Sequence, residues 1–217
     1  MSIKSDEILD TIRFMQSAFT MVMALALSES FKQFIEDKEN TGIHKNRIPA
    51  LLGFLFLIIP YFGGMSRYFF LSYTVKIHDG TISDQYGLQL LFDEIIFMFE
   101  AASFFCLSRM LSATKWRAFN LTLLILLTAD AIWLIEQRQA SGDAPRLWLI
   151  FDIIEFFALL ILRYCCITYE ISEAKRDTRE SKIKMRQVIF SCASSIIIFI
   201  MTIIDYIVNW NFRFPDI

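Results

Sequence analysis

Two long apolar runs constrain this chain more than any other feature of its sequence. They are Leu121–Ile135 and Val188–Ile204, and four further stretches of similar character precede or separate them. A helical segment of about 20 predominantly apolar residues matches the hydrocarbon thickness of a bilayer. Hydrophobic residues make up 55% of the 217-residue chain, which exceeds the share in ordinary soluble domains. The sequence therefore predicts an integral membrane protein built from helices.

We predict an all-α, polytopic bundle of about six transmembrane helices arranged as hairpins within a single transmembrane domain. Short links between consecutive spans favour antiparallel neighbours and leave no room for a separate soluble domain. The first span is the weakest, because polar residues dilute it; if it lay on the membrane surface, five spans would remain. The predicted spans are 11–34, 48–73, 88–111, 118–135, 147–169 and 188–210.

Local features refine this outline. Pro60, followed by Gly63 and Gly64, predicts a kink or break in the second span. Residues 170–187 are charged and rich in helix formers, so we expect a cytoplasmic loop that extends both flanking helices. The tryptophans at 116, 133, 148 and 210 lie near predicted span ends, which is typical of an interfacial aromatic belt.

A short internal similarity relates the last four spans. Phe92–Phe97 reads FDEIIF and Phe151–Phe156 reads FDIIEF, and each segment opens the first span of a hairpin. Both hairpins also carry an acidic residue in their second span. The pattern indicates either a duplicated hairpin unit or chance similarity between segments rich in Phe and Ile.

The distribution of Lys and Arg predicts the orientation. The loops after the first, third and fifth spans carry more of these residues than the opposite side does. The positive-inside rule therefore places those loops in the cytoplasm. It also places the early residues of spans three and five, and the late residues of spans four and six, in the outer half of the membrane.

Acidic residues inside the spans are the main candidates for a functional site. Each costs at least about 2.5–3.5 kcal/mol to insert at mid-membrane, so such residues seldom occur without a reason. Glu100 lies near mid-span, two turns from Asp93, and the others fall in the outer half. We expect Arg67 and Arg13 as counter-charges, and protons, water or a bound cation to neutralise the rest. The predicted cluster comprises Glu100, Glu155, Asp130, Asp152, Asp93 and Asp205.

Two alternatives for these acids stay open. Residues close to a span end often lie in the headgroup region, where they need no special partner. Glu100, the deepest, could instead hydrogen-bond to Ser or Thr on a neighbouring helix and hold the bundle together.

A basic stretch after the fifth span is the second candidate region. It could bind a cytosolic partner protein or anionic lipid, or simply be solvated on the cytoplasmic side. Its members are Lys175, Arg176, Arg179, Lys182, Lys184 and Arg186.

Other site classes find no support in the sequence. The four cysteines lack CxxC spacing, and His44 and His78 fall in loops on opposite sides, so we expect no metal site. No catalytic constellation or cofactor motif is present, so we expect neither an enzyme nor a bound cofactor. The net charge of −2 gives no argument for nucleic-acid binding.

Two hypotheses for the function are compatible with these features. A third, an intramembrane enzyme that acts on lipid, ranks last because the sequence shows no reactive constellation for it. The first is an oligomeric ion-conducting or ion-responsive protein of the bacterial inner membrane. The second is a non-catalytic anchor or sensor subunit of a multiprotein complex, such as a bacterial stress or phage-defence system. An acid-rich outer half beside an acid-poor inner half favours an outer vestibule or sensing site over a complete ion path. We expect a homo-oligomer or a complex with a cytosolic protein.

Overall fold

The described part of the chain is helical apart from short turns. A computed structural model describes residues 3–35, 47–80, 86–111, 115–140, 146–174 and 180–208, with side chains described over 6–35, 47–80, 87–111, 115–137, 147–170 and 185–208. No residue within these ranges forms a β-strand. The predicted all-α class is therefore confirmed.

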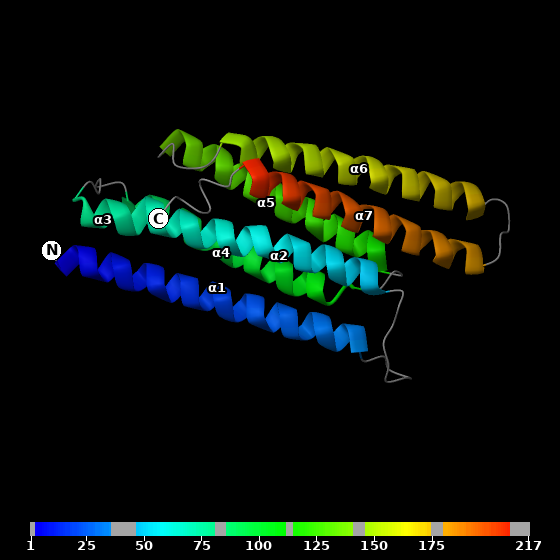
Figure 1. Cartoon of the computed structure of the whole chain (residues 1–217), viewed down its shortest axis with the longest axis horizontal. Helices are drawn as coiled ribbons and strands as arrows, with labels where there is room; N and C mark the ends of the chain where they lie inside the picture. The colour runs from blue at the N-terminus through cyan, green and yellow to red at the C-terminus, as the bar shows by residue number, and fades with distance from the viewer. Residues whose placement is uncertain are drawn as a thin grey trace.

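Six long helices follow one another along the chain. They are α1 (Ile3–Ile35), α2 (Ile48–Phe69), α4 (Tyr86–Ser108), α5 (Trp116–Ala140), α6 (Arg146–Ala174) and α7 (Glu180–Val208). A π-helix, η2 (Phe70–Val75), and a short helix, α3 (Lys76–His78), continue α2. Successive long helices run in opposite directions, so α1 begins and α7 ends at the same end of the bundle (Figure 1). We call this the terminal end, and the opposite end, where α1, α4 and α6 finish, the loop end.

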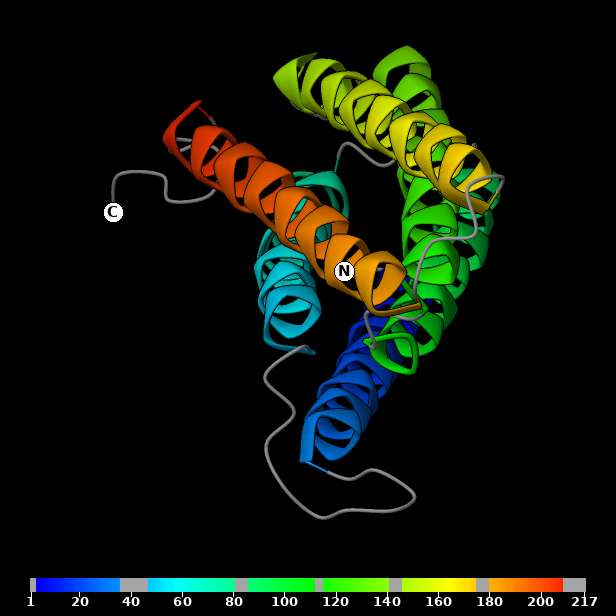
Figure 2. The ribbon, with the colours of Figure 1, turned by 90° about the vertical axis from the view of Figure 1, so that its right-hand side faces the viewer.

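The six helices form a closed ring. Helix α2 packs against α7 and α1, α1 against α4, α4 against α5, α5 against α6, and α6 against α7. Figure 2, seen along the bundle from the loop end, shows this arrangement. Contacts of α2 with α4 and of α5 with α7 cross the ring. The ring brings five helices to one shared interior, where the candidate site lies.

Helix α2 passes through Pro60 without interruption, so of the predicted kink or break the break is wrong, while a kink stays a prediction. The hydrogen-bonding pattern changes only at Phe70, where the π-helix begins. Two glycines of α2 instead allow neighbouring helices to approach closely. A Cβ atom at Gly64 would lie 2.9 Å from Cη2 of Trp148, and one at Gly53 would lie 2.8 Å from Oγ of Ser195.

Four of the helical stretches are long and apolar enough to cross a membrane, by length and composition. They are Asp6–Ile35, Ile48–His78, Trp116–Gln137 and Met185–Val208. The first, which the sequence marks as the weakest, is among them. Helices α4 and α6 are not, because both carry several charged residues, so the predicted count of six spans is not confirmed. Several long apolar helices nevertheless fit an integral membrane protein.

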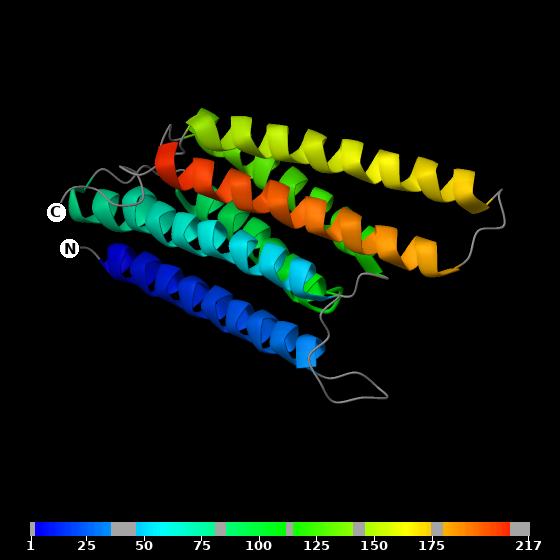
Figure 3. The ribbon, with the colours of Figure 1, turned by 45° about the vertical axis from the view of Figure 1, so that its right-hand side comes forward.

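At the loop end, α6 and α7 reach further than the other helices (Figure 3). Helix α6 extends to Ala174 and α7 begins at Glu180, with 175–179 outside the described residues. These ends carry the described part of the charged stretch 170–187.

Candidate functional site: an acid-lined cavity

A cavity of about 70 Å³ lies inside the ring of helices. Its lining comes from α2, α4, α5, α6 and α7. The lining residues of α6 fall in its first turns and those of α7 in its last described turns, whereas those of α2, α4 and α5 fall near the middle of each helix. One enclosed water needs roughly 10–15 Å³ by this measure. The cavity is therefore large enough for a few waters or a small cation.

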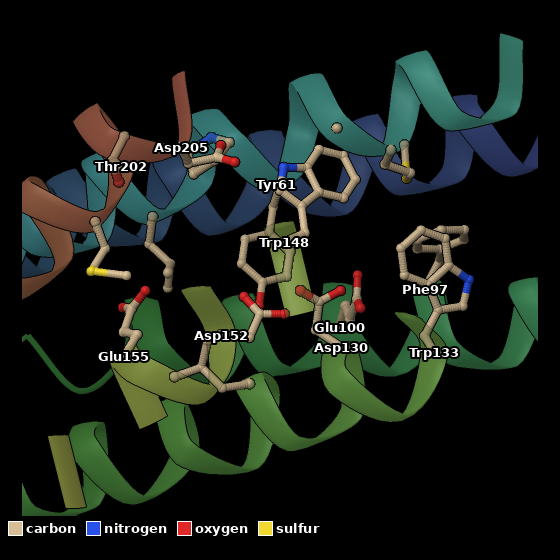
Figure 4. A pocket seen from close by; sticks show the side chains of 16 residues that line it. Tyr61, Phe97, Glu100, Asp130, Trp133, Trp148, Asp152, Glu155, Thr202 and Asp205 are labelled. Carbon is tan, nitrogen blue, oxygen red and sulfur yellow. The ribbon is translucent and has the colours of Figure 1, made fainter. Parts of the chain in front are cut away.

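Five of the six predicted acids line this cavity, and the structure brings them together from four helices (Figure 4). None of the described residues in the lining is basic. The cavity therefore collects negative charge without a neutralising side chain in its wall. The acids are Glu100 from α4, Asp130 from α5, Asp152 and Glu155 from α6, and Asp205 from α7.

Asp130 stands at the centre of the cluster. Its carboxyl group lies close to the side chains of Asp152, Tyr61 and Glu100. Within the described residues, Oε1 of Glu100, Oδ2 of Asp152 and Oε1 of Glu155 have no hydrogen-bond partner. Glu100 is only 1% exposed and Glu155 only 8% exposed. A buried carboxylate oxygen without a partner is costly, so the site calls for protons, water or a cation.

Four aromatic side chains complete the wall of the cavity. They are Tyr61 from α2, Phe97 from α4, Trp133 from α5 and Trp148 from α6. The ring of Tyr61 packs edge-on against Phe104 at 5.1 Å between centroids, and those of Phe97 and Trp133 lie 5.3 Å apart. Sequence analysis missed these residues as part of the site. The only signal was that Asp130 and Trp133 lie three residues apart, on one face of a helix.

The interfacial belt predicted for the tryptophans needs correction. Trp133 and Trp116 are each only 2% exposed, so neither faces the membrane surface. Trp116 donates a 3.0 Å hydrogen bond from Nε1 to Oγ of Ser194. Trp148 lines the cavity, and Trp210 lies outside the described residues. Trp116 thus serves helix packing, and Trp133 and Trp148 form part of the cavity wall.

Asp93, the sixth predicted acid, does not line the cavity, which corrects its expected place in the cluster. It is fully buried and has partners on both oxygens. Oδ1 accepts 2.8 Å hydrogen bonds from Nε1 of Trp133 and Nε2 of Gln137. Oδ2 accepts a 3.0 Å bond from the hydroxyl of Tyr68 and a second bond from that of Tyr73. Asp93 therefore ties α2, η2, α4 and α5 together as a structural group.

The π-helix explains how two tyrosines of one segment reach the same carboxylate. Tyr68 and Tyr73 are five residues apart, and the wider π turn, with hydrogen bonds between residues i and i+5, aligns positions at this spacing. An uninterrupted α-helix would turn them to different faces, because it aligns residues three or four apart.

The predicted counter-charges also lie elsewhere. Arg13 is exposed on α1 and forms a 3.3 Å ion pair with Asp10. The guanidinium group of Arg67 lies 5.3 Å from the ring centroid of Phe70, an outward-facing residue. Neither arginine therefore belongs to the cavity wall, and their role as counter-charges stays a prediction.

Buried apolar side chains, which we call the apolar layer, lie next to the cavity on the side of the loop end. Each lining helix contributes one buried side chain about one turn from its cavity residues, and each is at most 1% exposed. The rings of Phe54 and Phe104 contact each other at 6.4 Å, with Tyr61 on the cavity side of Phe104. This layer consists of Phe54, Phe104, Leu123, Leu159 and Ile198.

A second hollow of about 470 Å³ lies between α1, α2 and α4. Its described lining is apolar except for Glu94, so it offers little to an ion. Met65 and Phe97 belong to the walls of both hollows. The acid-lined cavity is thus the better candidate for an ion site.

The basic stretch is only partly described. Lys175, Arg176 and Arg179 lie outside the described residues, and Lys182 and Lys184 belong to α7 with side chains outside the described set. Arg186 is exposed, and its guanidinium group lies 3.6 Å from the ring centroid of Tyr169 on α6. Nearby, Arg117 forms an ion pair with Glu170. The loop end therefore presents cationic side chains close to the ends of α6 and α7.

No family model matches the chain, and no curated protein or solved structure matches it either.

Within the described residues, no three His, Cys, Asp or Glu side chains are grouped so that they could hold a metal ion. The cavity and the carboxylates that line it are therefore the features that bear on function.

Proposed function

We propose that this chain is a small ion-responsive membrane protein that binds protons or a cation in its acid-lined cavity. The observation that carries the proposal is the convergence of five carboxylates from four helices on one cavity with no basic residue in its described lining. Carboxylates gathered in a water-poor interior repel one another and need neutralisation. Because they sit on different helices, neutralisation changes the forces between α4, α5, α6 and α7. Occupancy of the cavity would thereby shift the arrangement of the bundle.

We further propose six membrane spans, with the loop end in the cytoplasm of a bacterial inner membrane. Helices α4 and α6 contain 23 and 29 residues, long enough for a hydrocarbon core of about 30 Å. Their composition counts against spanning, but Glu100, Asp152 and Glu155 face the cavity and not the lipid. Intramembrane acids of functional proteins face the bundle interior in this way.

An ion-responsive role is better supported than conduction. A conduit needs polar groups across the whole membrane, whereas the apolar layer separates the cavity from the loop end. A hydrophobic constriction of this kind blocks ions by excluding water. Ion passage would require the helices to move apart at this layer.

Titration of the purified protein in lipid nanodiscs tests this proposal. We expect a saturable change in tryptophan fluorescence as cation concentration or pH is varied, because Trp133 and Trp148 line the cavity. The change should be lost in the double variant Glu100→Gln, Glu155→Gln. It should persist in Asp10→Asn, which alters an exposed acid of α1.

Identical titrations of the double variant and the wild-type protein would contradict the proposal. Proteoliposomes add a second measurement. Wild-type protein is expected to give no ion flux above that of empty vesicles, and a substantial flux that depends on Glu100 would replace the responsive role with a conducting one.

The alternative role as a membrane subunit for a cytosolic partner has one observation in its favour. Helices α6 and α7 project beyond the bundle at the loop end and carry exposed Arg186 there (Figure 3). A triple change, Lys182→Glu, Lys184→Glu and Arg186→Glu, should then abolish pull-down of a partner. Amide replacements of the cavity acids should leave this pull-down intact.

A homo-oligomer is also proposed, and a monomeric mass in native nanodiscs would refute it.

A further inference from the structure

We infer that the cavity takes a small organic cation of the alkylammonium class in preference to an inorganic ion. This inference rests on the proposed cation-binding function and names the chemistry of the ligand. It follows from the arrangement of the acids, the aromatic wall, the size of the cavity and the unpaired oxygens.

Three of the acids, Glu100, Asp130 and Asp152, lie close together, whereas Glu155 and Asp205 lie apart from them in the cavity. Figure 4 shows Glu100 and Asp130 near the Phe97 side, with Glu155 and Asp205 toward the opposite side. Ca²⁺ and Mg²⁺ need about six or more oxygen ligands at roughly 2.0–2.6 Å from a single centre. No three acids of the described chain are grouped to provide them. Carboxylates on two sides of the cavity better suit a cation whose positive charge is spread over a larger surface.

The aromatic wall supplies what an alkylammonium group binds and a metal ion does not need. The rings of Tyr61, Phe97, Trp133 and Trp148 come from four helices and line the same cavity as the acids. Aromatic faces attract ammonium groups whose charge is spread over their methyl hydrogens, and tryptophan does so best. The apolar carbon surface of the ligand would meet these rings while the carboxylates neutralise its charge.

The cavity also limits the size of the ligand. At about 70 Å³ it equals roughly five enclosed waters, so we expect a cation of no more than about five heavy atoms. Gly64 helps to set this size, since the indole of Trp148 packs where a Cβ atom would otherwise lie. A larger side chain at position 64 would displace that indole.

Unpaired oxygens point to a ligand independently of the charge count. Oε1 of Glu100 and Oε1 of Glu155 have no hydrogen-bond partner within the described residues, although both side chains are more than nine-tenths buried. An ammonium group that retains an N–H bond could donate to one of them. Such bonds to a charged group are shorter and stronger than neutral ones.

Calorimetric titration of the protein in nanodiscs tests the inference, with trimethylammonium and tetramethylammonium chloride as probes. Sodium, potassium and magnesium chloride are the inorganic comparisons, and tert-butanol is a neutral molecule of similar size. We expect the organic cations to bind at least tenfold more tightly than the inorganic ions, and tert-butanol not to bind.

Variants separate recognition of the organic group from recognition of charge. Trp148→Leu should weaken trimethylammonium binding by about tenfold, because it removes a ring that attracts the cation, and leave the weak sodium binding unchanged. Gly64→Ala, which displaces the same indole, should act in the same direction. Phe31→Leu alters an exposed aromatic residue of α1 and should have no effect. Glu155→Gln should weaken binding of every cation.

The outcomes distinguish this inference from the proposed function. The organic-cation inference is overturned if an inorganic ion binds as tightly as the organic cations or more tightly. It is also overturned if Trp148→Leu and Gly64→Ala weaken the binding of all cations equally. Either result leaves the proposed function standing. If neither cations nor pH produce any response in folded wild-type protein, both fail.

Discussion

The indole of Trp133 links the hydrogen-bonded group around Asp93 to the acid-lined cavity. Its Nε1 atom donates a 2.8 Å bond to Oδ1 of Asp93, while its ring forms part of the cavity wall. The same ring packs edge-on against Tyr68 at 4.8 Å between centroids. One side of the cavity is thus held by a fully hydrogen-bonded carboxylate, whereas Glu100, Asp152 and Glu155 inside it each have an oxygen without a hydrogen-bond partner among the described residues. The first arrangement stabilises the bundle, and the second leaves room for a ligand.

Asp93→Asn is expected to destabilise the protein. The asparagine amide keeps one acceptor but directs an NH₂ group at donors that now bond to a carboxylate oxygen. Leaving buried donors unsatisfied costs about 1–3 kcal/mol. A lower melting temperature in nanodiscs, followed by circular dichroism, would show the loss. Asp10→Asn on the exposed face of α1 is the control, and equal melting temperatures of the two variants would contradict a structural role for Asp93.

Gly53→Ala should force α2 and α7 apart. The new Cβ atom would lie 2.8 Å from Oγ of Ser195 and 3.3 Å from its Cα atom, so part of the obstacle is backbone. Overpacking of this kind costs roughly 1–3 kcal/mol. Gly87→Ala is the matched control, because no atom lies within 4 Å of its added Cβ. Thermal unfolding should separate the two variants, and an unchanged melting temperature for Gly53→Ala would refute close packing at this site.

Asn120→Leu is expected to stabilise the protein. Asn120 is fully buried in α5, and both atoms of its amide lack a hydrogen-bond partner within the described residues. Replacement of an unsatisfied buried polar group by an apolar one of similar size removes a penalty of about 1–3 kcal/mol. Asn120→Ala should be less stable than Asn120→Leu, because it leaves a cavity. A lower melting temperature for Asn120→Leu would reveal that the amide has a partner, such as water or another subunit.

A polar substitution in the apolar layer should open a leak. Leu123 is fully buried in this layer, whereas Leu121, two residues earlier on the same helix, is 46% exposed. Leu123→Ser removes apolar bulk and adds a hydroxyl group that favours water entry. We expect measurable ion flux in proteoliposomes containing Leu123→Ser and none with Leu121→Ser or the wild type. Absence of flux in folded Leu123→Ser would show that other residues maintain the barrier.

Much of the fold follows from the sequence alone. Backbone groups within a membrane must be satisfied locally, so long apolar runs such as Leu121–Ile135 imply helices before any contact is known. Five of the six acids selected for their place inside the spans, Asp205 among them, also line the cavity. That choice needed only the cost of burying charge and the depths implied by the basic loops.

The tertiary structure decided which of these acids share a site. Asp93 and Asp152 open similar sequence segments, yet Asp93 meets four hydrogen-bond donors while Asp152 faces the cavity with an unpaired oxygen. The donors to Asp93 include Tyr68 and Gln137, which lie 25 and 44 residues away in the chain.

Local sequence determined where the helices form and which residues they carry into the membrane. The order of helices in the ring and the rotation of each helix about its axis came from packing between distant segments. Gly53, Gly64 and the π-helix at Phe70–Val75 contribute to that packing through close approach and a shifted turn. The periodicity of a single helix cannot encode these relationships, because they depend on the shapes of two surfaces at once.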